Sequence, residues 1–116
     1  MIFINSPFTI LDEVFRGLYP DKKYKACIEP SMKDDEGNRV FGFTEFSKGE
    51  TPVIAISAEL SIMDATEIFA HELAHVAAGE GVGHGERWDE EFQKIFDEYN
   101  RIGRERFGED GKEIET

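Results

Sequence analysis

Two histidines and a glutamate stand at the spacing of a metal-binding helix. In the run His71-Glu72-Leu73-Ala74-His75 the histidines are four residues apart, and residues at that spacing on an α-helix lie one turn above each other on one face. Both imidazoles can therefore bind one cation, as two ligands of a tetrahedral zinc site. Glu72 lies beside the pair and can take the proton of a water whose pKa the metal lowers to about 7. The pattern predicts hydrolysis by an activated water.

The third ligand must come from outside this run, and His84 is the favoured candidate. The chain has three histidines, all between positions 71 and 84. The glycines at 79, 81, 83 and 85 permit the sharp reversal that would bring His84 back beside its partners. Acidic side chains remain alternatives, because two histidines and a glutamate also make a zinc site. The acidic alternatives are Glu80, Glu86, Asp89 and Glu90.

The segment that carries the motif is expected to be a helix over residues 62–78. Ser61, with Asp64 three places later, is a helix-start signal, and Gly79 is the expected stop. Apolar positions recur at spacings of three and four, which is typical of an amphipathic helix. They are Ile62, Thr66, Phe69, Leu73, Val76 and Ala77.

Two further helices and a small sheet are expected around it. Ser6-Pro7 is a helix-start signal, so an amphipathic helix is predicted over residues 7–19, and another is predicted from Glu86 to near Gly103. Short turns separate three strand-like runs, which favours an antiparallel meander and an α+β fold. The runs are 24–29, 39–46 and 53–57, and the aromatic side chains expected to fill the interior are Phe41, Phe43 and Phe46.

Composition limits the other possibilities. A chain of 116 residues has room for one domain, expected over 1–107 with a charged, flexible tail over 108–116. The net charge of −12, with no basic run, argues against a dedicated binder of nucleic acid or anionic membranes. There is no apolar stretch of membrane-spanning length and no secretion signal, which predicts a cytoplasmic protein. The single Cys27 excludes an internal disulfide; it is expected as a small buried side chain, with a role as a latency ligand of the metal as the alternative.

Between the first histidine and Trp88 the sequence resembles the SprT-like and phage-associated zincin metallopeptidases. In that family a third histidine is followed by Gly-x-x and a large aromatic residue. Here the corresponding string is His71-Glu72-x-x-His75, an eight-residue gap that contains glycines, and His84-Gly85-x-x-Trp88. The run 53–57 before the motif helix also matches the family's order of edge strand and active-site helix, so the resemblance covers roughly residues 53–100.

The resemblance implies a minimal zincin domain that works as a zinc metalloendopeptidase on a peptide or protein substrate. It implies zinc held by His71, His75 and His84, with Glu72 as general base. It also implies a small sheet, an active-site helix that carries the motif, and a backing helix after it. Members that act on DNA-crosslinked proteins carry DNA-binding appendages, whereas this chain has one cysteine and no basic patch, so a small bacterial or phage member is the better match. A monomer is plausible.

Several further roles stay open at this stage. The run 53–57 is a candidate edge strand along which an extended peptide could pair. Trp88 either walls the metal pocket or packs in the core. A donor for the oxyanion of acyl transfer is needed besides the metal; the candidates are Tyr99, Arg87 and Arg101. Two other functions compete with a peptidase: a zincin-scaffold binding or regulatory module with structural zinc and no turnover, and a metal-assisted amidase acting on cell-wall peptides.

Overall fold

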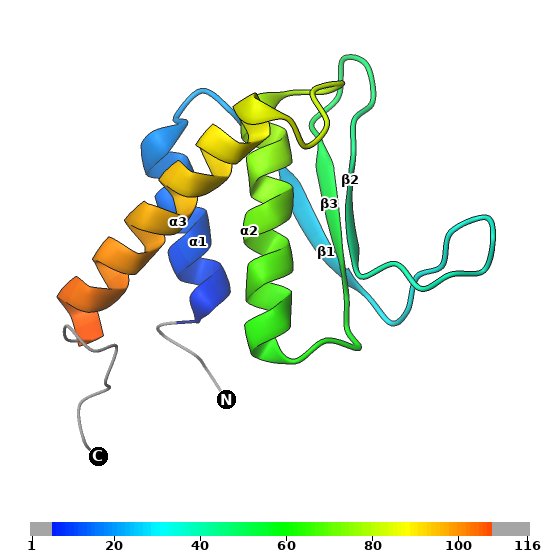
Figure 1. The fold of residues 1–116 in the computed structure, drawn as a ribbon, viewed down its shortest axis with the longest axis horizontal. Helices are drawn as coiled ribbons and strands as arrows, with labels where there is room; N and C mark the ends of the chain where they lie inside the picture. The colour runs from blue at the N-terminus through cyan, green and yellow to red at the C-terminus, as the bar shows by residue number, and fades with distance from the viewer. Residues whose placement is uncertain (1–5, 108–116) are drawn as a thin grey trace.

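The structure is a computed structural model that describes residues 6–107, so the predicted tail over 108–116 lies outside the described residues. Three helices and a small three-stranded mixed sheet make an α+β fold (Figure 1). The elements are α1 (Pro7–Leu18), β1 (Lys25–Glu29), β2 (Gly42–Glu45), β3 (Val53–Ser57), α2 (Ile62–Ala78) and α3 (Glu86–Phe107). α2 lies between the sheet and the other two helices, and it contacts β2, β3, α1 and α3.

Local capping signals explain where α1 and α2 begin. The side chain of Ser6 accepts a hydrogen bond from the Phe8 N–H, with a proline at the first helical position. Ser61 accepts one from the Asp64 N–H in the same way, and Gly79 ends α2 with a φ of 102°. The prediction of a helix over 62–78 is confirmed, and the first helix ends one residue before the predicted end.

α3 is longer than predicted, because it continues through Gly103 to Phe107. A glycine inside a helix costs about 1 kcal/mol relative to alanine. Two interactions offset that cost: Ile102 is buried, and Arg101 forms an ion pair with Glu105 across the glycine. Tertiary packing therefore overrides the local stop signal.

The sheet differs from the predicted antiparallel meander. The strand order is β1-β3-β2, with β1 parallel and β2 antiparallel to β3. The prediction that residues 53–57 form an edge strand is therefore wrong, since they form the central strand. Residues 54–57 are all buried, whereas every residue of β1 is exposed, so the most apolar strand occupies the middle and the polar strands form the edges.

One face of the sheet packs on α2, and this decides which strand residues are buried. Thr44 and Gly42 lie on the α2 face, and a Cβ at Gly42 would collide with the side chain of Ile68. Alternation along β2 sends Phe41 and Phe43 to the opposite face, where they are 41% and 43% exposed. The prediction that they fill the interior is wrong for both, and Phe46 is half-buried.

The core is built mainly from the helices and β3. Its largest fully buried side chains include Phe15 and Leu11 of α1, Ile54 of β3, Leu73 of α2 and Ile95 of α3. The prediction that Cys27 is buried is also wrong, because Cys27 is exposed on the edge strand β1. Ile62, the first position of the apolar stripe expected in α2, is 63% exposed. Among the helices of residues 6–107, none combines the length and the apolar character that a membrane span requires.

Candidate metal centre

The sequence of α2 places two histidines on one side of the helix and Glu72 on the side that faces the sheet. His71 and His75 are half-buried, with ring centroids 5.0 Å apart. The link between α2 and α3 then reverses the chain. Its glycines Gly79, Gly81 and Gly83 have φ values of 102°, 84° and 70°, a region that residues with a side chain rarely adopt. This reversal brings His84 back over α2.

The three imidazoles converge on one point. The Nε2 atom of His84 lies 3.0 Å from Nε2 of His71 and 3.0 Å from Nε2 of His75. These three residues, called the histidine triad below, form the one group of potential metal ligands found in residues 6–107. With zinc–nitrogen bonds of about 2.0–2.1 Å, the ligand nitrogens of a tetrahedral site lie about 3.3 Å apart. The spacing of the triad is close to that value, so the donor set fits a zinc ion.

The surroundings favour the neutral form of two of these imidazoles, which is the form that binds a metal. Burial, together with the charge of the neighbouring imidazoles, lowers the pKa of His75 to about 4. Burial and the charge of His84 also lower the pKa of His71. His84 is exposed, so solvent and ligands have access to the triad from that side.

Trp88 packs against the whole triad. Its ring centroid lies 4.7 Å from that of His71, 5.7 Å from that of His75 and 5.0 Å from that of His84. The indole Nε1–H also donates a hydrogen bond of 3.2 Å to the carbonyl oxygen of His71. Trp88 is half-buried, stacks on Phe92 in the next turn of α3 and packs against the hydrophobic core, so it walls the triad and contributes to the core at the same time.

Glu72 is a buried carboxylate held by the neighbouring strand. It is 5% exposed, and its Oε1 accepts a hydrogen bond of 2.8 Å from the hydroxyl of Thr44 on β2. Burial raises the pKa of Glu72, while the Thr44 hydrogen bond and the charge of His84 oppose the rise. Sequence reasoning missed Thr44, because nothing in a short strand 28 residues before Glu72 indicates that it will face α2.

The other sequence candidates lie elsewhere. The acidic alternatives for the third ligand are exposed and outside the triad: Glu80, Glu86, Asp89 and Glu90. Cys27 on β1 is also outside it. Of the oxyanion candidates, Arg87 pairs with Glu91 and Arg101 pairs with glutamates of α3. Tyr99 follows Trp88 by about three turns, or roughly 16 Å along the helix axis. The structure brings none of these three to the triad.

Comparison of the chain with protein-family models, with curated proteins and with solved structures found no match. The geometry of the triad and of Glu72 is therefore the basis on which a function can be assigned.

Proposed function

We propose that this chain is a zinc metallopeptidase with a minimal zincin-like fold, similar to the SprT-like and phage-associated enzymes, and that it hydrolyses peptide bonds in a peptide or protein substrate. The observation that carries the proposal is the convergence of three Nε2 atoms, 3.0 Å apart in two of the pairs, beside a buried carboxylate. Three histidine ligands with one open position are typical of catalytic zinc sites.

His71, His75 and His84 would hold the zinc ion. The bound ion would polarise the scissile carbonyl and lower the pKa of a water at the open position. Glu72 is the general base: it takes the proton of the attacking water and returns it to the leaving amine. Thr44 fixes the carboxylate through the 2.8 Å hydrogen bond to Oε1, which leaves Oε2 as the atom that exchanges the proton.

The outer strand β2 is the proposed support for the peptide backbone. β2 pairs with β3 on one side, and the edge of the three-stranded sheet on its other side can accept an extended peptide as a further strand. Because Thr44 belongs to β2 and contacts Glu72, a peptide paired there passes close to the general base. Pairing with an extended peptide, the role that was predicted for residues 53–57, is therefore assigned to residues 42–45.

The test is a comparison of Glu72→Gln with the parent. The variant keeps the size of the side chain and is expected to bind zinc as the parent does. Loss of the general base is expected to lower the cleavage rate by about 10²–10⁴-fold. Cleavage of an unfolded protein and of peptide and muropeptide libraries, followed by mass spectrometry, measures the rate and separates a peptidase from a cell-wall amidase.

Glu80→Gln is the matched control, because Glu80 is an exposed acid in the link that carries His84 and is expected to leave the rate unchanged. If Glu72→Gln cleaves as fast as the parent, the general-base assignment is wrong. If the parent binds zinc and yields no product from any library, the chain is a zincin-scaffold binding module instead.

A further inference from the structure

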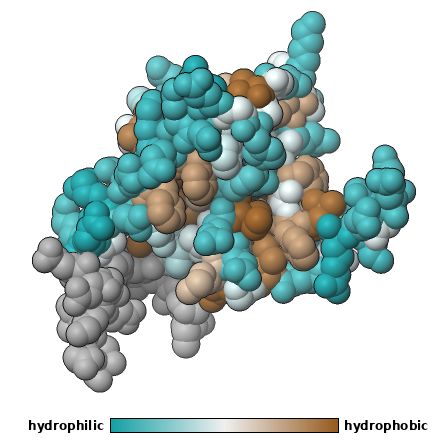
Figure 2. All heavy atoms as spheres, viewed as in Figure 1, coloured by the Kyte–Doolittle hydropathy of each residue, from teal (hydrophilic) through white to brown (hydrophobic). Residues whose placement is uncertain are grey.

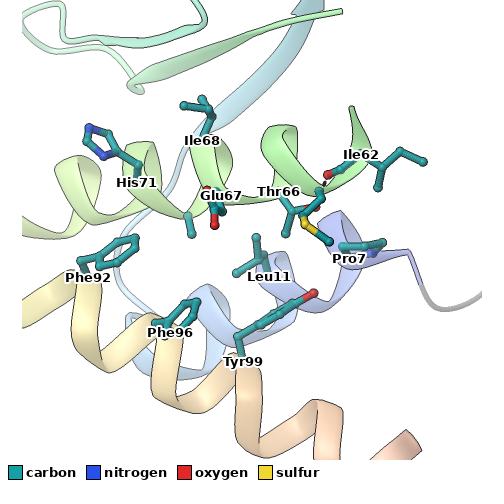
Figure 3. A pocket seen from close by; sticks show the side chains of 12 residues that line it. Pro7, Leu11, Ile62, Thr66, Glu67, Ile68, His71, Phe92, Phe96 and Tyr99 are labelled. Atoms are coloured by element: carbon teal, nitrogen blue, oxygen red, sulfur yellow. Dashed lines mark hydrogen bonds between the residues drawn. The ribbon is translucent and has the colours of Figure 1, made fainter. Parts of the chain in front are cut away.

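An open apolar groove extends from the histidine triad between α2 and α3. It has a volume of about 820 Å³, which lies within the range of ligand-binding pockets. In Figure 3 His71 lies toward one end of this space and Pro7 toward the other, with Leu11 of α1 between them. Figure 3 shows side chains from all three helices pointing into this space. His71 therefore belongs both to the lining of the groove and to the proposed metal centre.

A row of aromatic rings forms the α3 wall of the groove. Trp88, Phe92 and Phe96 follow one another at four-residue spacing, with ring centroids 5.1 Å and then 5.9 Å apart and interplanar angles of 12° and 15°. Trp88 packs on the triad, and the two phenylalanines line the groove. The row thus forms one continuous wall from the metal centre into the groove.

The opposite wall leaves large apolar side chains in contact with solvent. Met63 and Ile62 of α2 are 75% and 63% exposed, and Phe96 across from them is 41% exposed. Figure 2 shows hydrophobic residues gathered near the centre of this face amid hydrophilic ones. Single exposed apolar residues are ordinary, but a contiguous set that lines a groove indicates a binding surface.

We propose that this groove binds large apolar side chains of the peptide substrate next to the scissile bond, and so makes an apolar residue the specificity determinant. The inference rests on the proposed peptidase function. Glu72 contacts β2 on one side of α2, and His71 lines the groove on another side. A peptide that crosses the triad can therefore pair with β2 and place a side chain in the groove.

The side chains that line the groove favour an apolar side chain of the substrate over a charged one. Among residues 6–107 the lining contains one carboxylate, Glu67, and no lysine or arginine, so an acidic side chain would lose its hydration without gaining a cationic partner there. A phenylalanine or leucine side chain would instead bury apolar surface against the aromatic row. Discrimination by size in an apolar pocket reaches about 10–200-fold.

Binding is measured apart from turnover, on the protein as purified with Glu72→Gln so that the peptide survives. The probes are acetyl-Gly-Gly-X-Gly-Gly-amide peptides with X as phenylalanine, alanine or aspartate. Fluorescence of Trp88, the single tryptophan of the chain, reports binding at the aromatic row. The phenylalanine peptide is expected to bind at least tenfold more tightly than the alanine peptide, and the aspartate peptide least tightly.

Two groove variants and one control locate the binding. Phe96→Ala is expected to remove most of the preference for phenylalanine. Met63→Lys is expected to weaken binding of the phenylalanine peptide and to strengthen binding of the aspartate peptide. Met63 is 75% exposed, so a charge at this position is compatible with folding. Ile28→Ala is the control, because Ile28 is 58% exposed on the edge strand β1 and does not line the groove, and it is expected to change nothing.

The outcomes separate this inference from the proposed function. Cleavage by the parent with no preference between phenylalanine and alanine, and no effect of Phe96→Ala, overturns the groove assignment and leaves the peptidase intact. Selective binding without cleavage by the parent overturns the peptidase and leaves a peptide-binding groove. If the peptides bind only after residues 1–5 are deleted, the groove belongs to that apolar segment of the chain itself, and the proposal is overturned. If the protein is a dimer that Met63→Lys dissociates, the groove belongs to a second copy, and the proposal is overturned as well.

Discussion

Glu91 joins α3 to α1 through a buried carboxylate, and its replacement by glutamine is expected to destabilise the fold. Its side chain is 4% exposed. The hydroxyl of Tyr19 on the segment after α1 donates to Oε1, and the Nε–H of Arg87 donates to Oε2 at 2.9 Å. The ammonium of Lys94 lies 3.5 Å from Oε1. This network holds the part of α3 that carries Trp88.

The expected loss of stability depends on which of these hydrogen bonds a glutamine at position 91 can still form. Its carbonyl oxygen can still accept from Tyr19, but its NH₂ group faces the donor of Arg87, so that bond is lost together with the charge. Hydrogen bonds to ionised groups contribute about 1.5–3 kcal/mol each, and water replaces part of the loss because Arg87 is 57% exposed. We expect Glu91→Gln to lower the free energy of unfolding by about 2 kcal/mol, which corresponds to a fall in Tm of about 10 °C.

The same network predicts a pH dependence. Burial by itself raises the pKa of Glu91, but the hydrogen bonds from Tyr19 and Arg87 and the charge of Lys94 outweigh it, so the pKa lies below its ordinary value. A carboxylate with a lowered pKa in the folded state stabilises the fold above its unfolded pKa of about 4.3, and this stability is lost as the pH falls through the folded pKa. The difference between parent and Glu91→Gln is therefore expected to shrink below about pH 4.

Urea unfolding followed by circular dichroism, at pH 7 and at several acidic pH values, measures both effects. Glu98→Gln is the matched control: Glu98 also accepts hydrogen bonds from an arginine of α3, but its side chain is 30% exposed, so a loss of no more than about 0.5 kcal/mol is expected. Equal stabilities of Glu91→Gln and Glu98→Gln, or a difference between Glu91→Gln and the parent that grows in acid, would contradict this stabilising role of Glu91.

Three further substitutions test the packing around the triad. Gly42→Ala places a Cβ against Ile68 and is expected to cost about 1–3 kcal/mol of stability in thermal unfolding; an unchanged Tm would show that α2 does not pack this closely on β2. Thr44→Val removes the hydrogen bond to Glu72 and is expected to lower kcat about tenfold with the zinc content unchanged, while Thr44→Ser restores it; equal rates for both variants and the parent would contradict the positioning role. Gly83→Ala, at a φ of 70°, is expected to cost about 1 kcal/mol and to weaken zinc binding in a chelator titration; unchanged affinity would mean that the link can bring His84 to the triad without this conformation.

Local signals in the sequence predicted the helices well. Ser6 and Ser61 cap α1 and α2 as expected, and Gly79 ends α2, because each signal acts within a few residues of the helix end. The closeness of His71 and His75 also follows from helical spacing alone. The position of His84 beside the other two histidines depends on the glycines of a short link. Their positive φ values allow the chain reversal that the glycine spacing indicated.

The sheet could not be predicted in the same way, because strand pairing joins residues that are far apart in the chain. β1 pairs in parallel with β3, and β2 lies on the other side of β3, although short turns between consecutive strands favour a meander. The aromatic content of residues 41–46 indicated a strand, but it did not indicate which face α2 would cover. Because α2 covers the face of β2 that carries Thr44, Thr44 contacts Glu72 and Phe43 is exposed on the opposite face.

The metal content of the protein, purified without a histidine tag, shows whether the histidine triad binds zinc. Elemental analysis of the parent is expected to find one zinc ion per chain, and His84→Ala is expected to lose most of it while Glu80→Ala retains it. A parent that takes up no zinc, or a His84→Ala variant that binds zinc as tightly as the parent, would contradict a site built from His71, His75 and His84.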